Sequence, residues 1–277
     1  MKLYKTKEGI VAELNKNHYL IQSDWEKTIN RIGLHNYLKK MITQLKPTPE
    51  GAKLIESKLM PPIDTQEVWA AGVTYFRSKE ARMDESKKTG ASVFYDKVYE
   101  AERPEIFFKA TAMRVVGHEG KIRIRKDSTW NVPEPELTLF ISSANTIEGY
   151  TIGNDVSSRS IEGENPLYLP QAKTYNGSAA IGPCLYVPQS PISGDTGIHL
   201  SIFRNGLELF IGHAALSKMK RSLTELASWL TRELSFPSGV YLMTGTCLVP
   251  EDGFTLLSGD VVKIAIDNIG LLSNTVE

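Results

Sequence analysis

Two glutamates separated by one residue form the most informative pair in the sequence. Glu134 and Glu136 alternate with Pro133 and Pro135 and stand directly before the apolar run 137–141. In a strand, residues two apart share a face with their backbones about 6–7 Å apart, so both carboxylates can converge on one hard cation. The prolines cannot donate to a ladder and therefore predict an edge strand or a stiffened start of a strand. The alternative is a pair of solvent-facing glutamates on such an edge strand.

A third carboxylate stands at the end of another apolar strand. The segment 149–155 reads Gly-Tyr-Thr-Ile-Gly-Asn-Asp and ends at Asp155. An aspartate there is unusual if it is buried without a partner, and a metal ion would be such a partner. Three carboxylates that leave positions open for water and substrate match a Mg²⁺ or Mn²⁺ site. A Zn²⁺ site would require histidine or cysteine ligands, which do not occur at ligand spacing.

Two further residues have the chemistry of an acid and a base. Lys173 is the one charged residue in the segment 165–194, and burial of its amine would favour the neutral form that can take up a proton. The alternative is a surface lysine whose ammonium stays in solvent. Glu105 opens the apolar run 106–108 and, taken alone, is typical of a solvated strand end.

Taken together, these residues resemble the fumarylacetoacetate hydrolase superfamily. The resemblance covers about residues 66–277 and also includes the C-terminal segments 245–246, 257–262 and 269–276. It implies a mixed β-roll domain with an E-x-E…D divalent-metal site, usually for Mg²⁺, with Mn²⁺ and Ca²⁺ as alternatives, and an activity on 2-oxo acids. The metal ligands that the resemblance implies are Glu134, Glu136 and Asp155. The substrate contacts that it implies are Arg159, Lys173 and Thr246.

One departure from the family pattern narrows the implied activity. Hydrolases of this family usually carry G-x-N-Y-x-x-H-x-x-E, whose histidine activates water, whereas the histidine position here holds Ser78. A serine cannot act as the base at neutral pH without a partner. The sequence therefore resembles the dehydratase branch, which acts on 2-keto-3-deoxy sugar acids such as 2-keto-3-deoxy-D-arabinonate. That branch implies Glu105 and Lys173 as the catalytic pair and loss of the C4 hydroxyl through an enolate, giving a 2,5-dioxo acid.

Two other functions stay open at this point. The first is a hydrolase, isomerase or decarboxylase of an acylpyruvate-type 2-oxo diacid, and product analysis distinguishes it because a hydrolase splits the carbon chain. The second is an inactive metabolite-binding protein. This second alternative expects damaged ligands, whereas all three carboxylates and Lys173 are present.

Short strands must position most of these residues. The sequence predicts a two-residue hairpin at Asn205-Gly206, between 200–203 and 207–210. Few helices accompany the strands, which favours a β-rich α+β fold over an alternating one. The predicted strands are 68–73, 106–109, 121–125, 137–141, 147–152 and 260–266, and the predicted helices are 24–45, 79–88 and 222–233.

A proline-rich segment divides the chain. Residues 46–62 hold four prolines and predict a linker, which separates a small N-terminal domain (1–64) from a catalytic domain (65–277). The loop 157–170 is polar and is predicted to be either part of the wall or lid of the site or an ordinary surface connection. The family suggests a homodimer or homotetramer.

Composition excludes several classes of partner. Lys and Arg balance Asp and Glu at 32 each, which gives no support for nucleic acid or an anionic membrane surface. Met1–Ile10 is charged and lacks the apolar core of a signal peptide. Two cysteines without a CxxC motif suit a reducing compartment, so we expect a cytoplasmic protein.

Overall fold

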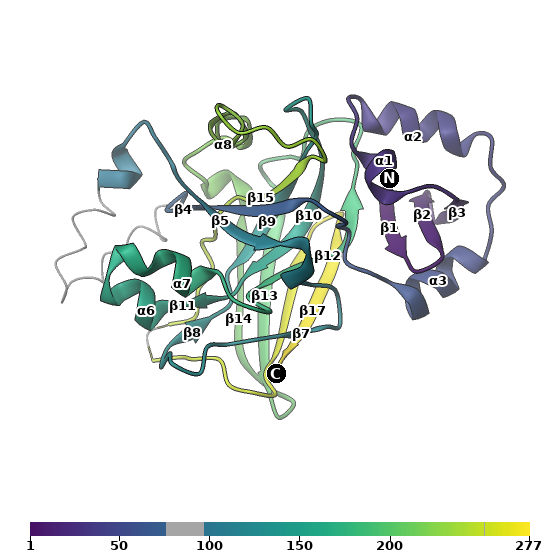
Figure 1. Ribbon diagram of the computed structural model, residues 1–277. Coiled ribbons are helices and arrows are strands. Elements are labelled where there is room, and N and C mark those ends of the chain that lie inside the picture. Colours follow the sequence, from purple (N-terminus) through teal and green to yellow (C-terminus); the bar gives the residue numbers. More distant parts are fainter. Residues whose placement is uncertain (76–96, 252) are drawn as a thin grey trace.

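The computed structural model describes residues 1–75, 97–251 and 253–277 (Figure 1). Strands dominate these residues and form sheets of ten, five and two strands. The β-rich α+β class expected from the sequence is therefore confirmed. The predicted helix 79–88 and Ser78 lie outside the described residues.

The ten-stranded sheet carries the candidate site. Its strands follow the order β3-β2-β1-β12-β10-β9-β15-β4-β5, with β6 paired to β12. Most neighbours are antiparallel, but β15 runs parallel to β4 and β6 parallel to β12, so the sheet is mixed. Its strands are β1 (Lys2–Thr6), β2 (Gly9–Leu14), β3 (Asn17–Ile21), β4 (Glu67–Gly72), β5 (Glu105–Thr111), β6 (Val115–Val116), β9 (Pro135–Ile141), β10 (Ile147–Asp155), β12 (Ala179–Tyr186) and β15 (Val240–Met243).

A five-stranded sheet, ordered β14-β13-β16-β17-β7, packs on the first sheet, and a two-stranded sheet pairs β11 with β8. The predicted hairpin joins β13 to β14, and positive φ angles of 53° at Asn205 and 80° at Gly206 fit its tight turn. The predicted strand 121–125 is shorter than expected. The strands are β7 (Lys121–Ile122), β8 (Asn131–Val132), β11 (Ser157–Ser158), β13 (Gly197–Arg204), β14 (Leu207–Ala215), β16 (Val261–Ile266) and β17 (Gly270–Val276).

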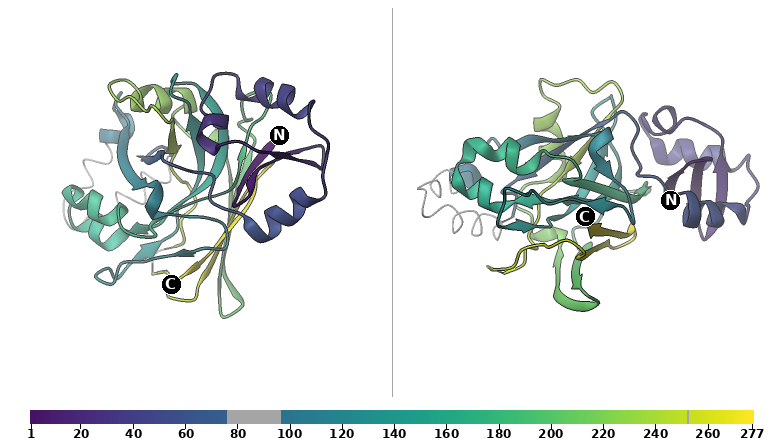
Figure 2. Two further views of the ribbon diagram at one scale, coloured as in Figure 1. Left: turned by 45° about the vertical axis from the view of Figure 1, so that its right-hand side comes forward. Right: turned by 60° about the horizontal axis from the view of Figure 1, so that its bottom comes forward.

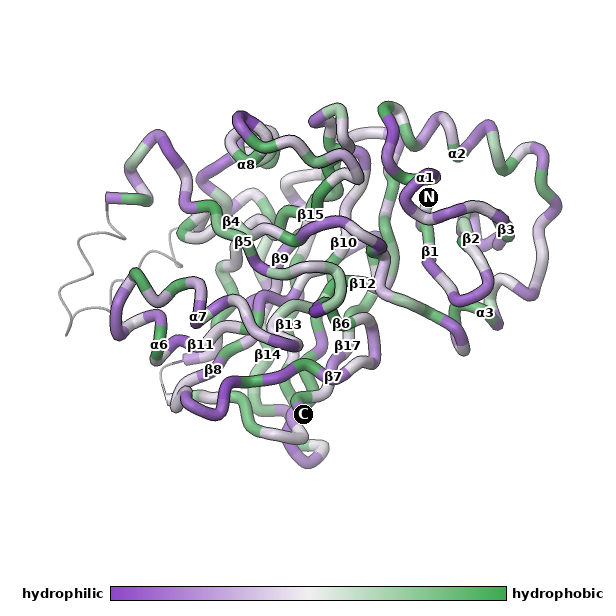
Figure 3. Tube along the Cα trace, in the orientation of Figure 1, coloured by the Kyte–Doolittle hydropathy of each residue, from purple (hydrophilic) through white to green (hydrophobic). Residues whose placement is uncertain are grey.

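Strand β9 lies in the middle of the large sheet, so the structure excludes the edge strand and fits the other predicted alternative, a stiffened start of a strand. It pairs with β10 on one side and β15 on the other, and every residue of it is buried. Pro135 is tolerated because it is the first residue of the strand, where little ladder bonding is lost. Leu139 faces the core shared with the five-stranded sheet, whereas Phe140 faces a second core shared with the N-terminal helices. Figure 3 shows stretches of hydrophobic residues, coloured green, in the strands in the interior of the molecule.

Helices lie around the sheets, and Figure 2 shows those of the N-terminal residues at one side of the molecule. The predicted helix 24–45 is broken in two because Gly33 has a left-handed φ of 69°. Helix α8 is confirmed, with Ser222 accepting a hydrogen bond from the Glu225 N–H at 3.1 Å. The helices are α1 (Trp25–Ile29), α2 (Leu34–Ile42), α3 (Glu50–Lys58), α6 (Arg159–Glu164), α7 (Leu169–Lys173) and α8 (Leu223–Leu230), with 3₁₀ turns η2 (Ala112–Arg114), η3 (Pro166–Tyr168) and η4 (Leu216–Lys218).

The N-terminal strands extend the large sheet, since β1 pairs with β12 through Leu3 and Leu185. The sequence analysis did not predict β1, β2 and β3. The predicted linker 46–62 contains helix α3, so the prolines flank a helix and do not form a continuous linker. Both cysteines are buried and free, as the sequence suggested.

Candidate active site

The structure brings the three predicted carboxylates together. Glu134, Glu136 and Asp155 each offer an oxygen atom within 4.8 Å of the others, and all three side chains are buried. Glu134 and Glu136 flank the first residue of β9, and Asp155 ends the neighbouring strand β10. The Asp155 N–H donates to the Glu134 carbonyl at 3.0 Å, which fixes the two strand ends beside each other. The expected convergence on one point is therefore present.

The negative charges of these buried carboxylates repel one another. Burial, followed by the negative charges of Asp155 and Glu134, raises the pKa of Glu136 well above its usual value. The backbone N–H of Gly245 donates to Glu136 Oε2 at 2.5 Å and partly offsets this effect. Burial also acts to raise the pKa of Asp155, but the positive charges of Lys109 and Lys173 outweigh it and lower that pKa.

Lys173 is completely buried, which excludes the alternative of a surface lysine. It is the last residue of α7. Its Nζ donates to Glu134 Oε2 at 2.6 Å, to Asp155 Oδ2 at 3.1 Å and to Ser157 Oγ at 2.5 Å. The loop that the sequence placed at 157–170 thus contains α6 and leads into α7, and it forms a wall of the site.

Arg159 also lies against the carboxylates. It opens α6, is 2% exposed and donates through Nη2 to Glu134 Oε1 at 2.7 Å. Its Nε lies 3.8 Å from Glu162 Oε2, and Glu162 Oε1 lies 3.8 Å from Lys173 Nζ. Glu162 is a fully buried acid that the sequence analysis missed. Its signal was an acid three residues after Arg159, on the same face of a helix.

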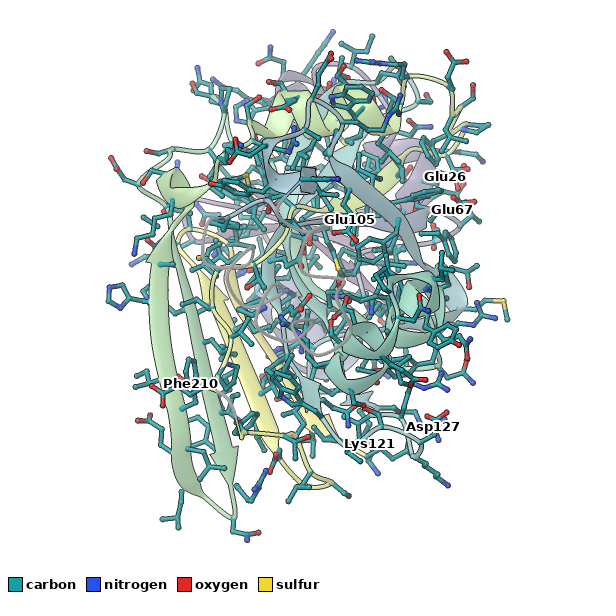
Figure 4. The ribbon with its side chains drawn as sticks, turned by 90° about the vertical axis from the view of Figure 1, so that its left-hand side faces the viewer. Glu26, Glu67, Glu105, Lys121, Asp127 and Phe210 are labelled. Atoms are coloured by element: carbon teal, nitrogen blue, oxygen red, sulfur yellow. The ribbon has the colours of Figure 1, made fainter. Side chains whose placement is uncertain are left out.

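Glu105 occupies the start of β5, opposite Gly72 in the ladder. A Cβ on Gly72 would lie 2.1 Å from Glu105 Oε2, so only glycine leaves room for this carboxylate. The Lys173 Nζ lies 5.6 Å from the ring centre of Phe107, which follows Glu105 on the same strand. Figure 4 shows Glu105 near the middle of this face of the molecule, whereas Lys121 and Asp127 lie at its lower edge.

Thr246 lies next in the chain to Gly245, which contacts one of the carboxylates. It follows Gly245, whose N–H binds Glu136, and its side chain is 5% exposed. Its Oγ1 accepts from the Leu248 N–H at 3.1 Å, which shapes the turn of this segment. The structure thus places Thr246 beside the carboxylates with its hydroxyl engaged by the backbone.

Lys109 is the other residue that the sequence analysis missed. It is fully buried on β5 and forms an ion pair with Asp155 Oδ1 at 2.5 Å. Its signal in the sequence was the same as that of Lys173, a single charge inside the apolar run 106–110. The partners of Lys109 come from the end of β10 and from α7, so its contacts form only after these elements have packed against β5.

The residues present fit a divalent cation. Four buried carboxylates face three buried cations, an excess of one negative charge. The carboxylates are Glu134, Glu136, Asp155 and Glu162, and the cations are Lys109, Arg159 and Lys173. Carboxylate oxygens are the ligands that Mg²⁺ prefers. Burial, and after it the neighbouring charges of Asp155 and Glu134, raises the pKa of Glu136, so a cation at this point would favour its ionised form.

Comparison with known proteins agrees with this fold. The family model described as fumarylacetoacetate (FAA) hydrolase C-terminal matches residues 67–277. The chain belongs to the fumarylacetoacetate hydrolase family. No helix among the described residues is long and apolar enough to span a bilayer.

Two curated relatives are both named as dehydratases. A probable 2-keto-3-deoxyxylonate dehydratase of Haloferax volcanii is 48% identical over 216 residues, covering 78% of this chain and 73% of the relative. A 2-dehydro-3-deoxy-D-arabinonate dehydratase of Saccharolobus solfataricus is 44% identical over 224 residues, covering 79% of this chain and 74% of the relative. Both names describe hydro-lyases of 2-keto-3-deoxy sugar acids.

A solved structure extends the similarity to the whole chain. A 2-keto-3-deoxy-D-arabinonate dehydratase complexed with magnesium and 2,5-dioxopentanoate superposes with a TM-score of 0.85 at 35% identity. The match covers 100% of this chain and 99% of that one. The fold of that dehydratase is therefore shared over the full length of this chain, including the N-terminal strands.

Proposed function

We propose that this protein is a Mg²⁺-dependent dehydratase of a 2-keto-3-deoxy sugar acid, such as 2-keto-3-deoxy-D-arabinonate, with a 2,5-dioxo acid as its product. The observation that carries this proposal is the buried group of Glu134, Glu136 and Asp155 beside Lys173. Two relatives at 48% and 44% identity, both named dehydratases, support the reaction. The structure similar over the full length, with magnesium and 2,5-dioxopentanoate bound, supports the cofactor and the product class.

Glu134, Glu136 and Asp155 are the proposed ligands of Mg²⁺, with Mn²⁺ and Ca²⁺ as alternatives. The bound ion supplies Lewis acidity that stabilises the negative charge developing on the substrate's keto oxygen. Arg159 keeps Glu134 in place through its bond to Oε1 and adds positive charge beside the site. We assign Arg159 and Thr246 to contacts with the anionic substrate.

Lys173 and Glu105 are the proposed proton-transfer pair. Loss of water requires one group to remove the C3 proton and another to protonate the departing C4 hydroxyl. Lys173 takes the first role as a neutral amine, a form that a bound divalent cation would favour by repelling positive charge on Nζ, and Glu105 takes the second in its protonated form. Lys173 reaches the carboxylates from α7, and Glu105 comes from β5, so the two approach the site from different elements. The surrounding burial excludes water that would otherwise compete for the protons.

We also propose the molecular context of this activity. Residues 65–277 form the catalytic domain and residues 1–64 an N-terminal domain, a division supported by the family match over 67–277. We expect a homodimer or homotetramer in the cytoplasm.

Substitution of the proton-transfer pair tests the proposed chemistry. Lys173→Ala and Glu105→Gln are assayed on a panel of 2-keto-3-deoxy sugar acids with Mg²⁺, and the exposed Lys263→Ala serves as the control. We expect each site variant to lose about 100-fold or more in kcat, since a positioned acid or base contributes about 10²–10⁴-fold. Full retention of dehydration by Lys173→Ala would remove that residue from the mechanism.

A further inference from the structure

Lys109 is a fully buried lysine to which the proposed reaction gives no role. A buried ammonium is costly unless every N–H is paired. Its Nζ donates to the carbonyl oxygens of Val156 at 3.1 Å and Lys173 at 2.5 Å, and it pairs with Asp155 Oδ1 at 2.5 Å. An ammonium has three donors. The two carbonyl oxygens accept two of them, and the Asp155 carboxylate lies in ion-pair contact with the ammonium, so the charge of Lys109 is met within the protein.

A bulge in β5 aims this side chain. Val68 of β4 pairs with Ala110, and the next residue, Trp69, pairs with Phe108, so Lys109 is the extra residue between them. Bulges interrupt a ladder and redirect a side chain, and they occur often beside active sites. The ammonium of Lys109, on strand β5, therefore points toward the end of β10.

The three partners of Lys109, two carbonyl oxygens and one carboxylate, belong to two separate elements. Asp155 and Val156 lie at the end of β10, whereas Lys173 is the last residue of α7. Ser178 Oγ also donates to the Lys173 carbonyl at 2.9 Å, so the end of this helix is held from two sides. Lys109 and Lys173 bind different oxygens of Asp155, Oδ1 and Oδ2, which fixes the rotation of that carboxylate.

We propose that Lys109 is a positioning residue of the active site. Its ammonium links Asp155 to the backbone of Lys173, so that a carboxylate and an amine on different elements keep one relative geometry before metal and substrate bind. This inference rests on the proposed function for the roles of Asp155 and Lys173. Partners that orient metal ligands in this way are worth about 10- to 100-fold in metal affinity or activity.

The test measures Mg²⁺ binding in the absence of substrate. Lys109→Met keeps the apolar stem and removes the charge and all three donors, and Lys109→Gln keeps an amide donor. By isothermal titration calorimetry, we expect the Mg²⁺ Kd to rise about 10- to 100-fold in Lys109→Met and less in Lys109→Gln. Hydrogen exchange over residues 169–174 should be faster in both variants, and kcat should fall more than KM changes.

Lys5→Met is the matched control. Lys5 also donates to a carboxylate, that of Asp64, and to a backbone carbonyl, that of Ile63, but it lies in the N-terminal strand β1. This control should lose stability with an unchanged Mg²⁺ Kd.

The outcomes separate this proposal from the proposed function. If Lys109→Met does not fold, the Mg²⁺ Kd and the exchange rates of Lys109→Gln decide whether Lys109 positions the site. Wild-type Mg²⁺ affinity and exchange rates in a folded Lys109 variant would overturn the positioning role, as would failure of both variants to fold where Lys5→Met folds. If wild-type protein binds Mg²⁺ but dehydrates no 2-keto-3-deoxy acid, the proposed function fails, and calorimetry on the Lys109 variants still decides the role of Lys109.

Discussion

The balance of charge around Lys173 distinguishes this site from a closed cluster of ion pairs. Four buried carboxylates outnumber three buried cations, which leaves one negative charge without a counterpart. A divalent cation turns this excess into a net positive charge of one. The loaded site then attracts a substrate that carries a single carboxylate, as 2-keto-3-deoxy sugar acids do.

Glu136 should make Mg²⁺ binding depend on pH. Burial and the charges of Asp155 and Glu134 raise its pKa, so protons compete with the metal, and the apparent Mg²⁺ affinity should fall as pH falls through that raised pKa. Calorimetric titrations at a series of pH values measure this dependence. An affinity that is flat with pH over the range where Glu136 takes up its proton would contradict the assignment.

In the metal-free protein, Glu136 should also make folding stability depend on pH. The direction is opposite to that of Mg²⁺ affinity, because stability should fall as pH rises. Between the usual carboxyl pKa and the raised one, folded Glu136 holds a proton that the unfolded chain has released. The free energy of unfolding should therefore decrease as pH rises through this window. Urea unfolding without metal measures the slope, and Glu136→Gln should reduce it. An equal slope in both proteins would show that Glu136 is not the responsible group.

The clustering of Glu134, Glu136 and Asp155 and the burial of Lys173 could be predicted because their signals are local. The E-x-E spacing at 134–136 and the isolated charge at Lys173 are visible in the sequence itself. Lys109 and Glu162 were missed because their partners are distant in the chain. Lys109 meets Lys173 only after β5 and α7 have packed on the end of β10.

At the scale of elements, the turn after β15 supports the site as much as the strands do. Gly245 has a φ of 92°, a left-handed conformation that favours glycine, and its N–H holds Glu136. A Cβ there would lie 2.0 Å from Thr74 Oγ1 and 3.0 Å from the Ala71 carbonyl oxygen. The backbone of this turn must therefore approach β4 closely.

Gly245→Ala should damage both stability and metal binding. We expect a loss of more than about 1 kcal/mol in unfolding free energy, since the backbone cost is joined by a clash, together with weaker Mg²⁺ binding as the bond to Glu136 is lost. Gly206→Ala is the matched control because Gly206 also has a positive φ, 80°, but has no neighbouring atom within 4 Å of its Cβ position. The control should lose about 1 kcal/mol with unchanged Mg²⁺ affinity. Equal Mg²⁺ affinities in the two variants would contradict the role of this turn.

Local patterns predicted most strands but not their neighbours. The hairpin at Asn205-Gly206 was correct because its turn chemistry is contained in two residues. The position of β9 stayed open between an edge strand and a stiffened strand start, since prolines that are typical of edges also fit the first residue of a central strand. The helix over 24–45 was predicted too long because periodicity outweighed Gly33.

At the scale of the whole molecule, the N-terminal residues share a core with the catalytic sheet. Leu3, Ile10 and Leu38 pack in one buried cluster with Phe140 and Leu185. This contact could not be predicted from local patterns, because pairing of β1 with β12 joins residues far apart in the chain. The N-terminal residues therefore cover one face and one edge of the sheet.

Removal of residues 1–64 should expose that surface. We expect the fragment 65–277 to aggregate or to unfold at a much lower temperature than the full chain, because β12 loses its neighbour and an apolar cluster meets water. Differential scanning calorimetry and light scattering measure this effect. A fragment as stable and monodisperse as the full chain would show that the shared core contributes little.

The product formed by the wild-type protein tests the central claim most directly. Purified enzyme is incubated with 2-keto-3-deoxy-D-arabinonate, with Mg²⁺ or with excess chelator, and the product is identified by mass spectrometry. The account predicts, with Mg²⁺ alone, a product that has lost one water and keeps its carbon chain. Two carbon fragments, an unchanged mass, or the same product under chelation would contradict it.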